Sequence, residues 1–481
     1  MSSKITILQM NDLHGYMEPH PELFWDGEKP IFKEAGGLAR ITSVIEEARA
    51  QNRGGVIALD NGDTIHGTYP VVASKGESIK QILNKMAFDA WTAHWDFAYD
   101  VPYLKKFTDD LDYPLLAINC YNKDNDELTF QPYRIIERKG IRVAVIGIAA
   151  TIVDKVMPEG FHTGVRLTLG EEELQKWVKY VRGEERAQLV IVLSHLGYPQ
   201  ELKMLSRVND IDVFLSGHTH NRVRKASVVN NAVIIQSGCH GSFVGKIDLN
   251  VSSEGKVKDF DHRLIHIDST INEDEEVYNL VESGIDPYRD MLNETVGVTK
   301  TDLHRNLVME CPMDNLLMQA LLDYSGADLA FSNGWRYGAP IPKGPIRMED
   351  LWNIIPVNPP VSICEITGQE VWDMMEMNLE RTFARDPYDQ MGGYVKRCMG
   401  LNLYFKVENP KGTRINRLFI NGKTYRPDKK YKVCYVTRQG VRPGFGSKKE
   451  DLEVKAIEVL KQYLGKNESV EAPLRNTIVP I

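Results

Sequence analysis

The chain has 481 residues, of which 42% are hydrophobic and 26% charged, and its formal net charge is -8. At about 150 residues per domain, this length predicts two or three domains. The acidic balance argues against a binder of nucleic-acid polymers, because such proteins cluster Lys and Arg on one face to neutralise phosphates. A small anionic substrate remains compatible with it.

The amino terminus enters an alternating strand-like stretch without an apolar export signal, and the longest nearly apolar run, Val143 to Val153, is about half the length of a membrane span. The six cysteines are dispersed, with no Cys-x-x-Cys pair, which is typical of reduced, buried thiols. These features predict a cytoplasmic protein with no membrane partner, and they leave its oligomeric state unknown.

In the first half of the chain, short β-branched runs alternate with helix-like stretches. This pattern predicts an α/β domain built of layered strands and helices. The predicted helices include 38–50 and 170–181, and the predicted strands are 5–8, 56–59, 115–118, 143–148, 189–193, 213–215 and 233–235.

A polar segment, Asp268 to Asp286, then runs into a helix-like stretch that ends near Asn293. We interpret it as the connection between domains, which gives a first domain at 1–270, a linker helix at 271–294 and a second domain at 295–481. Within the second domain, the patterns predict helices at 314–324 and 368–380 and strands near 401–407 and 431–436.

Polar side chains follow four of the predicted strands, each at the point where the strand ends. Ligands bind at the carboxyl edge of open α/β sheets, so these residues could converge although they are distant in sequence. They are Asp12 and His14 after the first strand, Asp60 and Asp63 after the second, His195 after the fifth, and His218 and His220 after the sixth.

The spacing of these residues is compatible with metal ligation. Asp12 and His14 stand two apart, as do His218 and His220, and Asp63 lies on a glycine-containing turn where a carboxylate could bridge two cations. Each motif alone is more typical of a hydrogen-bonded loop, but their recurrence after separate strands favours a metal site. Mixed imidazole and carboxylate ligands favour Mn, Zn, Fe or Co over Mg or Ca.

Together these motifs resemble those of the calcineurin-like metallophosphoesterases. The family's order of motifs is matched by Asp12-x-His14, Gly62-Asp63, the His94 segment, Ser194-His195 and Gly217-His218-x-His220. The branch of 5'-nucleotidases and 2',3'-cyclic phosphodiesterases is indicated by similar stretches at 7–15, 36–40 and, in its substrate domain, Ser332 to Arg336.

The resemblance implies a four-layer αββα catalytic domain followed by a smaller α/β domain of the 5'-nucleotidase C-terminal type. It also implies two divalent metal ions, one held by Asp12, His14, Asp63 and His220, and the other by Asp63, His94, His195 and His218. The implied reaction is hydrolysis of a small phosphoester, in particular a nucleotide, by in-line attack of a hydroxide that bridges the two ions. Asp63 and His94 are the implied catalytic residues.

The third family motif is altered here. The family has Gly-Asn-His-Glu-Phe-Asp, whereas residues 93–98 read Ala-His-Trp-Asp-Phe-Ala. Aligning Asp96-Phe97 puts His94 on the Asn ligand position and Trp95 on the catalytic His, whose proton transfer an indole cannot perform. A shifted alignment would keep His94 as the catalytic base and leave the second ion one ligand short.

The loss of this histidine suggests that good leaving groups, such as phosphoanhydrides or activated esters, are favoured. It also keeps two alternatives open. One is a hydrolase of a sulfur ester or another non-nucleotide anion, since a sulfur-oxidising relative carries a similar His-Trp-Glu-Phe pattern. The other is a nucleotide- or metal-binding protein without turnover.

In the second domain, the resemblance points to three residues that would bind substrate. Arg336 could hold a phosphate with the help of Asn333, and Tyr394 could stack on a base. The family's second stacking aromatic has no clear counterpart, because the segment from Thr437 to Phe445 lacks its motif. The base specificity therefore does not follow from the sequence.

Overall fold

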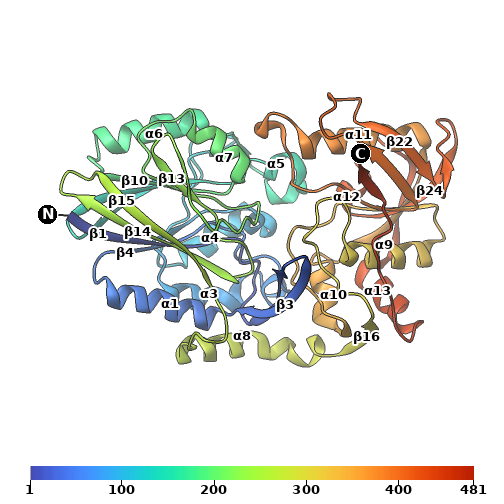
Figure 1. Cartoon of the computed structure of the whole chain (residues 1–481), viewed down its shortest axis with the longest axis horizontal. Helices are drawn as coiled ribbons and strands as arrows, with labels where there is room; N and C mark the ends of the chain where they lie inside the picture. The colour runs from blue at the N-terminus through green and yellow to red at the C-terminus, as the bar shows by residue number, and fades with distance from the viewer. Residues whose placement is uncertain (1) are drawn as a thin grey trace. The chain divides into compact units, whose positions relative to one another are not determined.

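The computed structural model describes residues 2–481, which form two compact units (Figure 1). The first unit contains the chain up to His20 together with Glu34–Pro287, and the second contains Pro21–Lys33 and Tyr288–Ile481. The division falls inside helix α8 (Glu275–Leu292), in the region where the sequence predicts a linker helix. Among residues 2–481, none of the helices combines the length and apolar character that crossing a bilayer requires.

The first unit is built on two β-sheets. In hydrogen-bonded order, the first sheet contains β15 (Val257–His266), β14 (Phe243–Ser252), β1 (Ser2–Met10), β4 (Val56–Asp60) and β5 (Ala90–Trp91). The second contains β12 (Ser227–Val229), β13 (Ala232–Ile235), β11 (Val213–Leu215), β10 (Leu189–Ser194), β8 (Ile141–Ile148) and β7 (Tyr133–Arg138). Strands β1 and β4 run parallel, as do β8, β10, β11 and β13, so within each sheet these strands end at one edge.

Three apolar cores separate four layers. Successive side chains of a strand point to opposite faces, so Ile5 and Ile7 of β1 pack toward the second sheet while Leu8 and Met10 pack toward helices. Helices α1 (Leu38–Gln51) and α3 (Glu77–Met86) cover the first sheet, and α6 (Glu171–Gly183) and α7 (Tyr198–Leu205) cover the second (Figure 1). The predicted αββα architecture is confirmed.

One predicted strand is wrong. Residues Leu115 to Ile118 are buried, but they form only isolated bridges, Trp91 with Leu115 and Leu116 with Gln131, and no continuous ladder. Their side chains enter all three cores of the first unit. The apolar run indicates that these residues are buried on several sides, but burial alone does not determine whether a segment pairs as a strand.

The second unit contains a five-stranded and a four-stranded sheet. The first has the order β20 (Arg397–Met399), β17 (Leu329–Ser332), β24 (Lys430–Val436), β19 (Pro360–Thr367) and β25 (Ser447–Lys455), and the second has β23 (Lys423–Thr424), β22 (Ile415–Ile420), β21 (Leu401–Phe405) and β26 (Ile478–Pro480). The two helical stretches predicted for this half lie within helices α9 (Pro312–Ser325) and α11 (Gly368–Phe383). The mixed α/β character predicted for this half is confirmed.

Candidate metal centre

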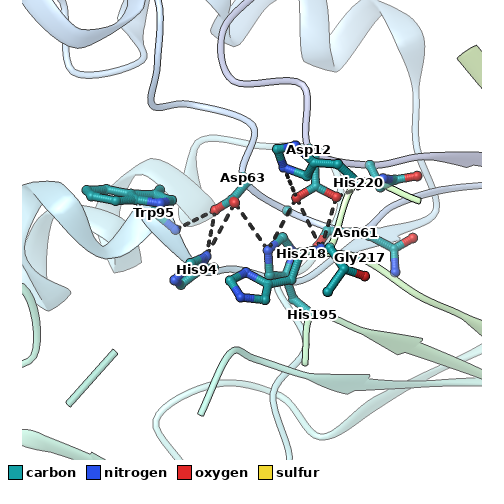
Figure 2. A network of polar contacts seen from close by, with 12 residues as sticks. Asp12, Asn61, Asp63, His94, Trp95, His195, Gly217, His218 and His220 are labelled. Carbon is teal, nitrogen blue, oxygen red and sulfur yellow. Dashed lines mark hydrogen bonds and ion pairs between the residues drawn. The ribbon is translucent and has the colours of Figure 1, made fainter. Parts of the chain in front are cut away.

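Seven side chains from loops at the strand ends converge in the first unit, and we call them the cup. They form two groups that share Asp63, and within each group the candidate ligand atoms lie within 4.8 Å of one another. One group is Asp63, His94, His195 and His218 (Figure 2), and the other is Asp12, His14, Asp63 and His220. The structure therefore brings together the same two sets that the resemblance implies.

Asp63 is the centre of the first group. Its Oδ1 lies 3.2 Å from His94 Nδ1, and its Oδ2 lies 3.2 Å from His195 Nε2 and 3.5 Å from His14 Nε2. One carboxylate thus faces imidazoles of both groups, which is the arrangement that a bridging ligand requires.

The second group is arranged around Asp12. Its Oδ1 lies 3.1 Å from His220 Nε2, and His220 Nε2 in turn lies 3.2 Å from His14 Nε2. Asp12 also accepts hydrogen bonds from the backbone N–H of His218 and from Asn11 Nδ2. These contacts orient the carboxylate toward the cup.

The loops that carry these side chains have an uncommon backbone. Five of the seven cup residues adopt the left-handed region, with φ between 51° and 72°: Asp12, His14, Asp63, His218 and His220. Each such residue costs of the order of 1–3 kcal/mol unless the surroundings hold it, and these conformations concentrate at functional sites. The short turns allow consecutive ligands to leave a strand and point in the same direction.

Two glycines let the loop after β4 lie against the segments that follow β1 and β5. Backbone hydrogen bonds join Asp12 N to Gly62 O and His14 N to Asp63 O. Gly62 has φ 86°, and a Cβ there would lie 2.5 Å from Thr92 O. At Gly67 a Cβ would lie 2.1 Å from His14 O, so the backbone of a cup residue occupies the space of a side chain.

Gly67→Ala is therefore expected to move the His14 loop and destabilise the protein by about 1–3 kcal/mol, as overpacking does. A thermal unfolding experiment measures this as a lower Tm. Gly183→Ala is the matched control, because its Cβ would meet open space. Equal Tm values for the two variants would contradict the close approach at Gly67.

The cup carboxylates are held in their ionised form. Burial raises the pKa of Asp63, but the imidazoles of His94, His195 and His14 outweigh burial and hold that pKa well below its usual value. Burial lowers the pKa of His195, yet Asp63 and Asp12 outweigh it and raise this pKa to about 10. The buried carboxylates of Asp63 and Asp12 therefore favour positively charged groups in the cup.

The hydrogen bonds of two histidines prepare them for ligation. Nδ1–H of His195 donates to Asn61 O at 2.5 Å, and Nδ1–H of His14 donates to His66 O at 3.2 Å. In the neutral rings this leaves Nε2 as the atom that can ligate a cation, and in both residues Nε2 faces the Asp63 carboxylate. This donor set fits divalent metal ions that accept mixed nitrogen and oxygen ligands.

Several supporting residues were missed by the sequence analysis. Asn11 and Asn61 hold Asp12 and His195 as described, and the buried Asp96 accepts backbone N–H groups near Asp63 and His94. Their only sequence signal is adjacency to the motifs. Asp60, which the sequence places among the candidates, instead accepts hydrogen bonds from Gly62 N and Thr64 Oγ1 and belongs to neither group.

Trp95 lies beside the cup and not in it. Its backbone N–H donates to Asp63 Oδ1 at 2.6 Å (Figure 2). Its ring stacks on His66 with centroids 4.9 Å apart and packs edge-on to Phe161. His94 is the residue that joins Asp63 in the metal group, as the alignment on Asp96-Phe97 requires.

The predicted substrate residues cluster in the second unit. Tyr394 Oη lies 3.3 Å from Asn333 Nδ2 and donates to Gly334 O at 3.0 Å, and the Arg336 guanidinium carbon lies 5.8 Å from the Tyr394 ring centroid. Arg397 approaches the same ring at 5.2 Å. Asn333, Arg336 and Tyr394 are thus neighbours, and Arg397 is a fourth member that the sequence did not reveal.

Comparison with known proteins gives the family. The family model for calcineurin-like phosphoesterase matches residues 5–222, and that for the 5'-nucleotidase C-terminal domain matches residues 293–437. The chain belongs to the calcineurin-like phosphoesterases of the 5'-nucleotidase type. This phosphoesterase is a hydrolase of phosphoric esters, and its cup is a candidate site for divalent metal.

Relatives of the phosphoesterase are distant in sequence. It is 24% identical to the 5'-nucleotidase of Vibrio vulnificus, with 97% of this chain and 91% of that protein covered. It is also 24% identical to the trifunctional nucleotide phosphoesterase protein YfkN of Bacillus subtilis, over 85% of this chain but only 30% of that protein.

Two solved structures show the same fold. The sulfate thiohydrolase SoxB of Thermus thermophilus is 23% identical with a TM-score of 0.91, covering 100% of this chain and 97% of that one. The 5'-nucleotidase precursor of Thermus thermophilus is 21% identical with a TM-score of 0.87, covering 99% of both chains. At these identities the likeness concerns the fold alone.

Proposed function

We propose that this phosphoesterase hydrolyses nucleotides with two divalent ions bound in the cup. The observation that carries the proposal is the pair of ligand groups joined by Asp63. Bound ions would supply Lewis acids that neutralise phosphoryl oxygens and lower the pKa of water. We propose Mn, Zn, Fe or Co as the ions, because five imidazoles accompany only two carboxylates.

The protein's own residues would prepare this reaction. Asp63 and Asp12 keep negative charge in the cup to hold the ions, while His195 and His14 present Nε2 lone pairs fixed by their Nδ1 hydrogen bonds. For the substrate, we propose that Arg336 binds an anionic group and that Tyr394 stacks on a base, with Asn333 as a hydrogen-bond donor. The Vibrio vulnificus relative, named a 5'-nucleotidase, supports a nucleotide substrate.

Chelation tests the proposal. Purified protein treated with a chelator is expected to release no phosphate from nucleoside monophosphates or nucleotide anhydrides and to form no nucleoside monophosphate from cyclic nucleotides, and Mn²⁺ or Zn²⁺ is expected to restore these reactions. The physical reason is that the cup without ions lacks the Lewis acids that would neutralise the charge on the phosphoryl oxygens. Phosphate release unaffected by complete metal removal would contradict the assignment.

A sulfur-ester hydrolase is the second candidate, favoured by Trp95 and by the fold shared with the sulfate thiohydrolase. Measuring phosphate and sulfate separately on a panel of both ester types distinguishes the two. We expect phosphate as the product, and sulfate release without phosphate release would replace the nucleotide proposal.

A further inference from the structure

Asp96 is a fully buried carboxylate next to the cup. It lies two residues after His94, in the short 3₁₀ helix Trp95–Tyr99, and it is 0% exposed. A buried carboxylate needs several hydrogen bonds to offset its loss of hydration. All of the hydrogen bonds described for Asp96 come from the backbone of the two loops that carry Asp63 and His94.

Each oxygen of the Asp96 carboxylate accepts two of these hydrogen bonds. Oδ2 accepts from Asp63 N at 2.9 Å and from His94 N at 3.1 Å, and Oδ1 accepts from Thr64 N and Ile65 N, both at 2.9 Å. Successive N–H groups of this kind form an anion-binding nest, and here the anion is part of the protein. In return, Asp63 Oδ1 accepts the N–H of Trp95, so the two loops hold each other.

We propose that Asp96 is a positioning residue that sets the affinity of the group Asp63, His94, His195 and His218 for a divalent ion. Asp63 is shared by both groups, but His94 belongs only to this one. The Oδ2 atom of Asp96 fixes the backbone of Asp63 and His94 together, and so fixes the separation of their side chains. The inference rests on the proposed metal centre.

Asp96→Asn tests this role with little change in shape. Whichever way the amide turns, its NH₂ group must face two N–H donors, so one of the two pairs loses its acceptor. Titration of the metal-free protein with Mn²⁺ by calorimetry is expected to show one of the two binding constants reduced about 10- to 100-fold, with a smaller change in the other.

Asp212→Asn is the matched control. Asp212 also accepts a backbone hydrogen bond, from Val190 N at 2.7 Å, and pairs with Arg182 at 2.6 Å, but it precedes β11 at the end of that strand remote from the cup. We expect this variant to bind both ions as the wild type does. A folded Asp96→Asn variant whose two constants match those of Asp212→Asn would overturn the proposal.

Hydrogen exchange on the wild type gives a second test that needs no variant. The amides of Asp63, Thr64, Ile65 and His94 are expected to be protected in metal-free protein, because Asp96 accepts their hydrogen bonds whether or not an ion is bound. Fast exchange that slows only when Mn²⁺ is added would overturn the positioning role. A wild type that binds no ion while these amides are protected would instead contradict the proposed function.

Discussion

Asp63→Asn is expected to abolish phosphate release, with kcat/KM falling by more than about 1000-fold, since loss of a single stabilising donor alone can cost that much. Asp63 is the only cup residue shared by both ligand groups, and its carboxylate approaches three imidazoles. The asparagine keeps the shape but replaces one oxygen with an NH₂ group that cannot ligate a cation. Both ions are therefore expected to be lost, as elemental analysis of the purified variant would measure.

Asp212→Asn again provides the comparison for this variant, because it removes a carboxylate of the same unit at a distance from the cup. It is expected to keep both ions and the wild-type rate. Circular dichroism and thermal unfolding should show that Asp63→Asn is folded. A folded Asp63→Asn protein that retains metal and more than about a tenth of the activity would refute the bridging role.

Trp95→His is expected to raise the hydrolysis of simple alkyl phosphates by about 100-fold, the lower range for a positioned general acid. The wild type carries an indole beside Asp63, and its backbone N–H, not its ring, contacts the Asp63 carboxylate. Without a proton donor at this position, the rate depends strongly on how well the leaving group carries negative charge. The wild type is therefore expected to prefer aryl phosphates and phosphoanhydrides to AMP.

Trp95→Phe separates the effect of adding a proton donor from the effect of removing the indole. It removes the indole without adding an acid, so alkyl phosphates are expected to remain poor substrates. Initial rates on an aryl phosphate, AMP and ADP, measured for all three proteins, provide the test. A wild type that strongly prefers AMP to an aryl phosphate would show that the leaving group is not limiting.

Most of the cup could be predicted from the sequence, because its ligands lie in short motifs that can be recognised locally in the chain. Six of the seven ligands follow a predicted strand, and parallel strands end at one edge of a sheet, so neighbours in space can be inferred without coordinates. His94 was indicated only by the family resemblance. The apolar runs that predict β1 and β10 place alternate side chains in different cores, because successive side chains of a strand point to opposite faces. Long, periodic elements such as α1 were placed to within a residue or two for this reason.

What the sequence did not reveal depends on tertiary contacts. The left-handed backbone of Asp12 and His14 and the hydrogen bonds to Asp96 arise only when separate loops pack together. One local signal was overlooked: Gly27 begins the two-residue turn that joins strands β2 (Pro19–Asp26) and β3 (Lys29–Gly36), and its φ of 59° suits a hairpin turn. The cluster of Arg397 with Tyr394 was out of reach, because nothing in the pattern near Arg397 distinguishes it from a surface cation.

The most direct test of a dinuclear centre is anomalous diffraction from crystals of the wild-type protein grown with Mn²⁺. We expect two anomalous peaks, one on each side of the Asp63 carboxylate, each surrounded by the imidazoles of its own group. A single peak, or peaks outside these seven side chains, would contradict a cup that holds two ions.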